Sequence, residues 1–440
     1  MKHIYIGDLK ENTNVELLCW LANKRIFKNH LFLSLYDSTG TIQGIVNSEK
    51  KELYNNLSKV TKESALKIIG KVIKHQDKLQ IEITDYVIMA LATLNISPSP
   101  NDNNFDVFEH KNARQVIEHP TFYIRNRKLS TVYYLKSCFK REMQDYFWNL
   151  DFVEFEAPSL TKQTLYKDSG ALWLDVQGQK VTLSRCATFH LEPAIIPYEK
   201  IFTITNSHAD ERVRTNRHLI EYLHLKAEMC WVNLEELIEF AGEMYYNIAL
   251  NTYMKHKERF HEIVSEEKMK NKLEKLNPKN HVHITYDEAV KIIRDSGIEF
   301  EYGKSLTTKQ EKIITKHFNE NFVWVKYIPY TVEGFMFKRT KDNPYLTETC
   351  DLIAPNGFGE ILGCATKMTN YDDIISSMKE KEKFDGYERY KDYALLHQFG
   401  LPYHGGIGMG IERALRFLLD LDHVKYTKPF AVIKGSQINH

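Results

Sequence analysis

The sequence carries almost no excess charge of either sign. Its 440 residues include 59 lysines and arginines against 58 aspartates and glutamates, which leaves a net charge of +1 with neutral histidines. A protein that attracts nucleic acid over its whole surface is therefore excluded. Any contact with a polyanion must be made by a local group of basic residues.

Cysteine and long apolar runs are also scarce. No signal peptide and no apolar run of membrane length is visible, so we expect a cytoplasmic protein that makes no membrane contact. The cysteines show neither a C-x-x-C pair nor a zinc-ligand spacing, which predicts reduced and mostly buried thiols. There are six of them: Cys19, Cys138, Cys186, Cys230, Cys350 and Cys364.

The chain is long enough for two or three domains, because 43% of its residues are hydrophobic and can form buried cores. Short strand-like runs at the start predict a small five-stranded β-barrel. Prolines and asparagines in residues 95–104 have no apolar period and indicate a linker. We predict a barrel over residues 1–98, a linker over 99–115 and a second domain over 116–440. The expected barrel strands cover residues 15–21, 31–35, 41–46, 68–73 and 80–89.

The densest polar cluster of the chain lies within residues 201–231. Alternating apolar residues in 201–204 and again in 219–225 predict an antiparallel pair of strands. Guanidinium groups between them could grip phosphate oxygens, and carboxylates nearby could hold a metal. A solvated hairpin tip would have the same composition. The connecting span contains Asp210, Glu211, Arg212, Arg214, Arg217 and His218.

A second candidate segment lies near the end of the chain. Four glycines in residues 405–410 lead into a helical pattern with Ile411, Ala414, Leu415 and Leu418 on one face. Glycines allow a ligand or strand to approach the backbone, and a helix N-terminus favours an anion. This signal is weak alone, but together with the first cluster it predicts a nucleotide site.

Other segments predict the framework of the second domain. Residues 130–150 and 234–257 have helical periodicity, with Asn233 as the cap of the second helix. Thr285 and Glu288 form the pattern of a capping box. The basic residues 268–279 suggest a solvated connection. Strands are expected over residues 323–327, 334–339 and 348–352.

These segments resemble the class II aminoacyl-tRNA synthetases of subclass IIb. The strand-loop-strand and the G-x-G-x-x-R pattern are similar to motifs 2 and 3 of that family. The runs TNRHLIEY, DLIAPNGFGEILG and HGGIGMGIER are closest to the asparaginyl-tRNA synthetase subgroup. The resemblance covers nearly the whole chain and implies an α+β fold, with an anticodon-binding OB-fold barrel and a catalytic domain of antiparallel sheet flanked by helices. Residues 130–158 resemble motif 1, which implies a homodimer; a core helix and an edge strand would also fit this segment.

The resemblance implies a complete site for ATP and Mg²⁺. Asp351 and Glu360 match the magnesium carboxylates, and a hard cation with phosphate oxygens suits such a pair. Catalytic roles are implied for Glu211, Arg217 and Arg413. The implied ATP-binding residues are Glu211, Arg217, His218, Tyr222, Asp351, Glu360 and Arg413.

In the barrel, the same resemblance implies contacts with tRNA. Phe32 and Gln43 match positions that stack on and hydrogen-bond to an anticodon base, and Arg25 matches a contact to nearby nucleotides. An ordinary strand residue and a surface cation are the alternatives for Phe32 and Arg25.

The acid-binding half departs from the family pattern. Ala209 occupies the place of the motif 2 arginine that holds the α-phosphate and the substrate carboxylate, and Lys167 the place of a glutamate that binds the α-amine. Lys367 replaces an arginine that contacts the substrate side chain. Arg212 or Arg214 could fill the space at Ala209. The predicted substrate pocket comprises Lys167, Cys186, Thr188, Ala209, Glu228, Lys367 and His404.

Three functional hypotheses follow. The first is an AMP-forming ligase, a paralogue that activates a small carboxylate other than asparagine and transfers the acyl group to an amine or hydroxyl. The second is a genuine asparaginyl-tRNA synthetase with an unusual pocket. The third is a non-catalytic protein that binds nucleotide or tRNA for regulation. The changed acid pocket beside an intact ATP site favours the first.

Overall fold

The computed structural model describes residues 3–102, 104–165, 168–210, 215–436 and 438. The chain divides into two compact units, Met1–Arg127 and Lys128–His440, and each is described by itself. None of the described helices is long and apolar enough to span a bilayer. The limits proposed above for the two domains and the linker remain a prediction.

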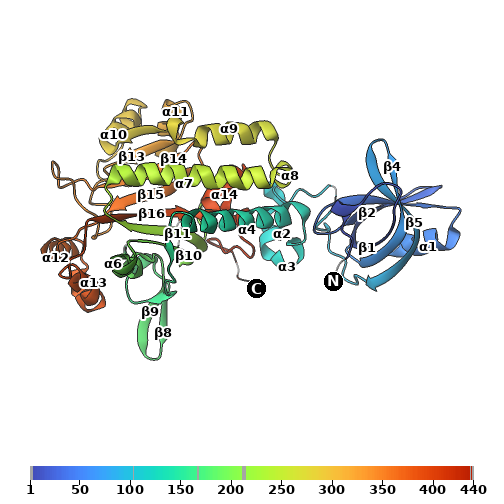
Figure 1. Ribbon diagram of the computed structural model, residues 1–440, viewed down its shortest axis with the longest axis horizontal. Coiled ribbons are helices and arrows are strands. Elements are labelled where there is room, and N and C mark those ends of the chain that lie inside the picture. The colour runs from blue at the N-terminus through green and yellow to red at the C-terminus, as the bar shows by residue number, and fades with distance from the viewer. Residues whose placement is uncertain (1–2, 103, 166–167, 211–214, 437, 439–440) are drawn as a thin grey trace. The chain divides into compact units, whose positions relative to one another are not determined.

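The first unit contains a closed barrel with strand order β1-β2-β3-β5-β4, which confirms the predicted OB-fold (Figure 1). Alternate residues point inward, so that Leu31, Leu33 and Leu35 of one strand are fully buried. A helix between β3 and β4 was not predicted. The elements are β1 (Asn14–Ile26), β2 (His30–Tyr36), β3 (Thr41–Asn47), α1 (Lys51–Lys59), β4 (Ala65–His75), β5 (Lys78–Ala90), α2 (Ala113–Glu118) and α3 (Pro120–Tyr123).

The second unit is built on an eight-stranded sheet of order β12-β13-β14-β15-β16-β11-β10-β6. Only the two outermost pairs, β12 with β13 and β10 with β6, are parallel. The expected α+β class is confirmed, with a mixed sheet in place of a purely antiparallel one. The strands are β6 (Val153–Glu154), β10 (Lys200–His208), β11 (Glu221–Cys230), β12 (Val282–Thr285), β13 (Val323–Lys326), β14 (Thr349–Ala354), β15 (Gly359–Thr366) and β16 (His404–Gly410).

Helices cover this sheet, and α7 crosses β15 and β16 (Figure 1). Asn233 caps α7, and Thr285 with Glu288 forms the capping box of α10, as predicted. A small second sheet contains β7 (Leu160–Thr161), β8 (Trp173–Val176) and β9 (Gln179–Leu183). The helices are α4 (Arg127–Trp148), α5 (Thr188–Leu191), α6 (Ile195–Tyr198), α7 (Leu234–Lys255), α8 (Lys257–His261), α9 (Glu266–Leu276), α10 (Tyr286–Asp295), α11 (Thr308–His317), α12 (Tyr371–Glu380), α13 (Lys391–Leu396) and α14 (Ile411–Leu418).

Two predictions about local structure were wrong. Residues 268–279 are not a solvated connection, because most of them belong to α9, which Ser265 caps and which buries Met269 and Leu276. Residues 334–339 form no regular strand and make only isolated bridges. There, Phe335 and Met336 are both buried although they are neighbours, which breaks the alternation that a strand requires.

The glycines of residues 405–410 lie in a central strand and not in a loop. β16 pairs with β11 on one side and with β15 on the other. A Cβ atom on Gly405 would come within 2.6 Å of the Ala365 carbonyl oxygen, and one on Gly406 would collide with the Glu228 carboxylate. The glycines therefore permit close approach of neighbouring groups, and α14 starts directly after them.

Candidate active site and nucleic-acid interface

A cavity of about 680 Å³ opens over the centre of the large sheet. It is lined by residues of β11, β15, β16 and the start of α14, together with parts of the segment before β10. Seven residues that were singled out from the sequence meet in its wall: Cys186, Asp210, Arg217, His218, Tyr222, Glu360 and Arg413. The two candidate segments, far apart in the chain, thus form one site.

The central hairpin and the glycine strand build this wall. β10 and β11 pair antiparallel as predicted, with Ile204 opposite Leu225. Side chains alternate along β11, so Tyr222, His224 and Lys226 all face the cavity. Of the glycines of β16, Gly408 and Gly410 line the cavity.

Two arginines in the cavity wall are held by contacts with neighbouring groups. Arg413 Nη1 lies 3.3 Å from Glu360 Oε2, and Arg413 Nε donates to the carbonyl oxygen of Arg217 at 3.3 Å. Arg217 Nη1 lies 2.5 Å from Glu311 Oε2, and both side chains are at least 90% buried. Glu311 was not predicted as a site residue, because it lies in α11 and no local motif marks it. Both guanidinium groups are therefore held in place before any phosphate arrives.

His218 lies beside these arginines and is an uncharged member of the site. Burial, followed by the positive charges of Arg413 and Arg217, lowers the pKa of His218 to about 4. Its Nδ1 lies 2.5 Å from Thr215 Oγ1. Near neutral pH, His218 can therefore hydrogen-bond to a phosphate but adds no positive charge.

Carboxylates gather next to the arginines. Burial and then Glu360, Glu333 and Glu311 raise the pKa of Asp351 well above its usual range. Burial would raise the pKa of Glu360 too, but Arg413 and Arg217 bring it below its usual value. A divalent cation would relieve the repulsion among these acids.

Asp351 and Glu360 lie on the neighbouring strands β14 and β15, as predicted, and fit a magnesium ion that also takes phosphate oxygens. Within the described residues, no group of three or more histidines, cysteines or acids could hold a metal by itself. Such a donor set suits Mg²⁺ that arrives with ATP.

Behind the cavity, Lys367 is buried between two glutamates. Its Nζ lies 2.7 Å from Glu192 Oε1 and 2.6 Å from Glu228 Oε1, and none of these side chains is more than 3% exposed. Burial alone would lower the pKa of Lys367, but Glu192 and Glu228 raise it above its usual value. His404 Nε2 lies 3.8 Å from Glu192 Oε2. The structure thus brings together three predicted pocket residues and adds Glu192, which sequence reasoning missed.

Not all of the other predicted pocket residues line the cavity. Ala209 is buried, and its backbone N–H donates to the carbonyl oxygen of Ile220. Cys186 Sγ lies 3.2 Å from Thr188 Oγ1, and of these only Cys186 lines the cavity. Four candidates, Lys167, Glu211, Arg212 and Arg214, lie outside the described residues, so their roles remain predictions.

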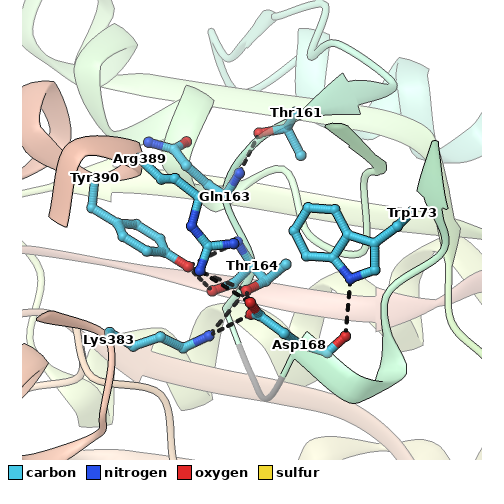
Figure 2. A network of polar contacts seen from close by, with 8 residues as sticks. All are labelled: Thr161, Gln163, Thr164, Asp168, Trp173, Lys383, Arg389 and Tyr390. Carbon is cyan, nitrogen blue, oxygen red and sulfur yellow. Dashed lines mark hydrogen bonds and ion pairs between the residues drawn. The ribbon is translucent and has the colours of Figure 1, made fainter. Parts of the chain in front are cut away.

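A network around Asp168 ties one edge of the cavity to a later segment (Figure 2). Asp168 Oδ1 lies 3.1 Å from Lys383 Nζ, and Oδ2 lies 3.0 Å from Arg389 Nη2. Thr164 Oγ1 also donates to Asp168, and Tyr390 Oη donates to the carbonyl oxygen of Thr164. Residues 165 and 170 of the same segment line the cavity. The network therefore fixes this edge, and no motif predicted it.

We expect Asp168→Asn to loosen this edge without unfolding the domain. The change removes the charge that Lys383 and Arg389 share, so amide hydrogen exchange in residues 163–165 and 168–171 should accelerate by about tenfold. Asp175→Asn is the matched control, because Asp175 accepts a hydrogen bond from the Gly178 N–H at the β8–β9 turn and takes no part in the Asp168 network. Equal exchange rates in the Asp168 variant and the native protein would contradict the prediction.

The barrel has a separate cavity of about 470 Å³ that brings Arg25, Phe32 and Gln43 together. Arg25 pairs with Phe32 across β1 and β2, and its guanidinium carbon lies 6.0 Å from the ring centroid. Phe32 is only half-buried, whereas its neighbours Leu31 and Leu33 form the core. The ring is thus available to a ligand and is not a core residue.

Comparison with known proteins places the chain in a family. Residues 112–434 match the family of class II tRNA synthetases (D, K and N), and residues 15–89 match the OB-fold nucleic acid binding domain. The chain is 26% identical to an asparagine–tRNA ligase of Lactobacillus delbrueckii over 94% of both chains, and 27% identical to one of Pyrococcus abyssi over 97% of both.

A solved structure agrees with these matches. Asparaginyl-tRNA synthetase from Pyrococcus horikoshii, complexed with asparaginyl-adenylate, superposes with a TM-score of 0.90 at 23% identity over 99% of both chains. The family match covers well over half of the chain and includes the cavity described above. The protein therefore belongs to the class II aminoacyl-tRNA synthetases of the D, K and N group, as an AMP-forming ligase.

Proposed function

We propose that the protein is an asparaginyl-tRNA synthetase, which activates asparagine with Mg-ATP and transfers it to tRNA. The observation that carries this proposal is the buried Lys367–Glu228 pair. Lys367 offers a donor, and Glu228 Oε2 has no hydrogen-bond partner among the described residues. A carboxamide presents the complementary acceptor and donor side by side.

The charges around Lys367 favour an asparagine side chain over an aspartate side chain. Glu192 and Glu228 carry two negative charges against the one positive charge of Lys367. An aspartate side chain would add a third carboxylate to this buried group, whereas an asparagine side chain adds no charge. Like-charge contacts of this kind are strongly unfavourable where water is excluded.

The nucleotide half supports the reaction class. Arg217 and Arg413 would bind the triphosphate, and Tyr222 would support the adenine ring. Asp351 and Glu360 would hold Mg²⁺, which when bound neutralises phosphate charge. The relatives are asparagine–tRNA ligases, which also supports asparagine as the amino acid. Activation of asparagine is therefore better supported than activation of another carboxylate.

Pyrophosphate exchange tests the proposal directly. The native protein should incorporate labelled pyrophosphate into ATP when asparagine is present, and aspartate should be at least a hundredfold less effective. A panel of other small carboxylates should be no better than aspartate. If asparagine gives no exchange above background, the proposal is wrong.

A different acid is the second candidate, and Ala209 favours it. An uncharged, buried residue stands where a synthetase of this subgroup would carry the arginine that holds the substrate carboxylate. Exchange that depends on another member of the panel, and not on asparagine, would select this candidate. The third hypothesis, a non-catalytic regulatory protein, receives no support from a family of ligases.

We also propose that the barrel binds the anticodon of tRNA. Phe32→Ala should then weaken tRNA binding by about 1–3 kcal/mol, because a half-buried ring beside Arg25 and Gln43 offers a stacking surface. ATP binding should be unchanged. Filter binding of tRNA and calorimetry with ATP on the same variant would measure both effects.

Trp20→Ala is the matched control for this prediction. Trp20 is an aromatic residue of the same barrel, 42% exposed, and it does not line the cavity that contains Phe32. Its removal should leave tRNA affinity unchanged. If both variants lose affinity equally, or only the melting temperature falls, Phe32 has no recognition role.

A homodimer that uses α4 and residues 151–158 is part of the same proposal. Tyr134 and Trp148 of α4 are 44% and 53% exposed within the chain and could be covered by a second copy. Light scattering at micromolar concentration would test this assembly.

A further inference from the structure

Lys226 is a positive charge without a partner in the wall of the large cavity. No hydrogen bond or ion pair within the described part of the chain reaches its Nζ atom, and the side chain is half-buried. Two arginines of the same cavity wall differ from Lys226, because Arg217 pairs with Glu311 and Arg413 with Glu360. An ammonium group that is partly removed from water and has no counterion is unfavourable, and a bound anion would relieve this cost.

The position of Lys226 along β11 indicates which part of a bound ligand would supply the anion. Tyr222, at one end of the row, is the proposed adenine platform, and Glu228, at the other end, lies in the proposed side-chain pocket. Lys226 stands between them, opposite Gly408, where an added Cβ atom would lie 3.1 Å from Lys226 Nζ. Groups bound at the two ends would meet in front of Lys226.

Among the described residues, the neighbouring groups on β11 and α14 do not pair with Lys226, although Arg185 and Asp210 also line the cavity. Burial and then Lys226 and Arg413 lower the pKa of His224 well below its usual value, so the neighbouring imidazole is neutral. Of the nearby acids, Glu228 pairs with Lys367 and Glu412 pairs with Lys136. Glu228 and Glu412 are each engaged with another lysine, so neither pairs with Lys226.

We propose that Lys226 binds the anionic junction between nucleotide and acid, namely the α-phosphate and the substrate carboxylate, in the absence of an arginine at Ala209. This inference rests on the proposed function and names a binding residue for it. In the reaction, a carboxylate oxygen attacks the α-phosphorus, and the bond from that phosphorus to the bridging oxygen of the β-phosphate breaks. Pyrophosphate leaves with the electron pair. Lys226 would stabilise the additional charge on the phosphoryl oxygens as this happens.

Binding of AMP and adenosine separates this role from the rest of the site. Calorimetry on the native protein should show tighter binding of AMP than of adenosine, since only AMP carries the phosphate. Lys226→Met should weaken AMP binding about tenfold and leave adenosine binding within twofold. Lys226→Arg should retain most of the preference. Lys326→Met is the control, because Lys326 lies in β13 of the same sheet and pairs with Glu235.

Two outcomes would overturn the inference: a native protein without preference for AMP over adenosine, or an unchanged preference in Lys226→Met. Pyrophosphate exchange by Lys226→Met should fall about 100- to 1000-fold, with melting temperature unchanged. If the native protein fails to exchange with asparagine, the proposed function fails, but the AMP comparison still tests Lys226. The two proposals can therefore fail separately.

Discussion

Lys367→Met is expected to lower the free energy of unfolding by about 3–5 kcal/mol. The substitution leaves Glu192 and Glu228 without the cation that lies within 2.7 Å of each, and both carboxylates are almost fully buried. Two uncompensated negative charges in a low-dielectric interior repel each other and have lost most of their hydration. Urea denaturation, followed by a probe in the second unit, would measure the loss.

The origin of this effect can be checked with a rescue. Adding Glu192→Gln and Glu228→Gln to Lys367→Met removes all three charges and should restore much of the stability, because the three groups act together. Lys326→Met breaks an ion pair whose acid, Glu235, is 58% exposed, and it should cost no more than about 1 kcal/mol. Equal losses for Lys326→Met and Lys367→Met would contradict our account of the buried pair.

Arg413→Met is expected to lower pyrophosphate exchange by about a thousandfold. The residue would bind phosphate, and it also holds other parts of the site: its guanidinium contacts the side chain of Glu360 and the backbone carbonyl of Arg217. Losing one such charged group typically costs a factor of 10² to 10³ in rate. Misplacement of Glu360 and Arg217 would add to this loss.

Arg413→Lys separates charge from geometry. It keeps the positive charge but cannot reach Glu360 and the carbonyl of Arg217 at once, so we expect a loss of about 10- to 100-fold. Steady-state exchange rates at saturating ATP would measure both variants. Wild-type rates in Arg413→Met would remove Arg413 from the catalytic site.

Much of the framework could be predicted from the sequence because its signals are local. The hairpin of β10 and β11 follows from apolar alternation, and the capping box of Thr285 and Glu288 joins residues three positions apart. The nucleotide residues were found through the family resemblance of three short segments. The structure adds that these segments meet in one cavity.

Other parts of the site could not be predicted because they depend on contacts between remote residues. Arg217 and Glu311 are separated by 94 positions, and nothing near Glu311 marks it as a partner. From the sequence, Lys367 was interpreted only as a replacement for an arginine. The structure shows that it forms ion pairs with two buried glutamates, Glu192 and Glu228. The helix α9 was missed because its many lysines obscured the apolar face formed by Met269, Leu273 and Leu276.

The glycine strand β16 has a consequence for protein engineering. Replacing glycine by alanine is a common way to stabilise a protein, since each glycine in a strand costs roughly 0.5–1 kcal/mol relative to alanine. In β16 this strategy should fail. A methyl group at Gly405 would meet the backbone of β15, and one at Gly408 would press on His224 and Lys226. A search for heat-resistant variants should therefore leave the glycines of this strand unchanged.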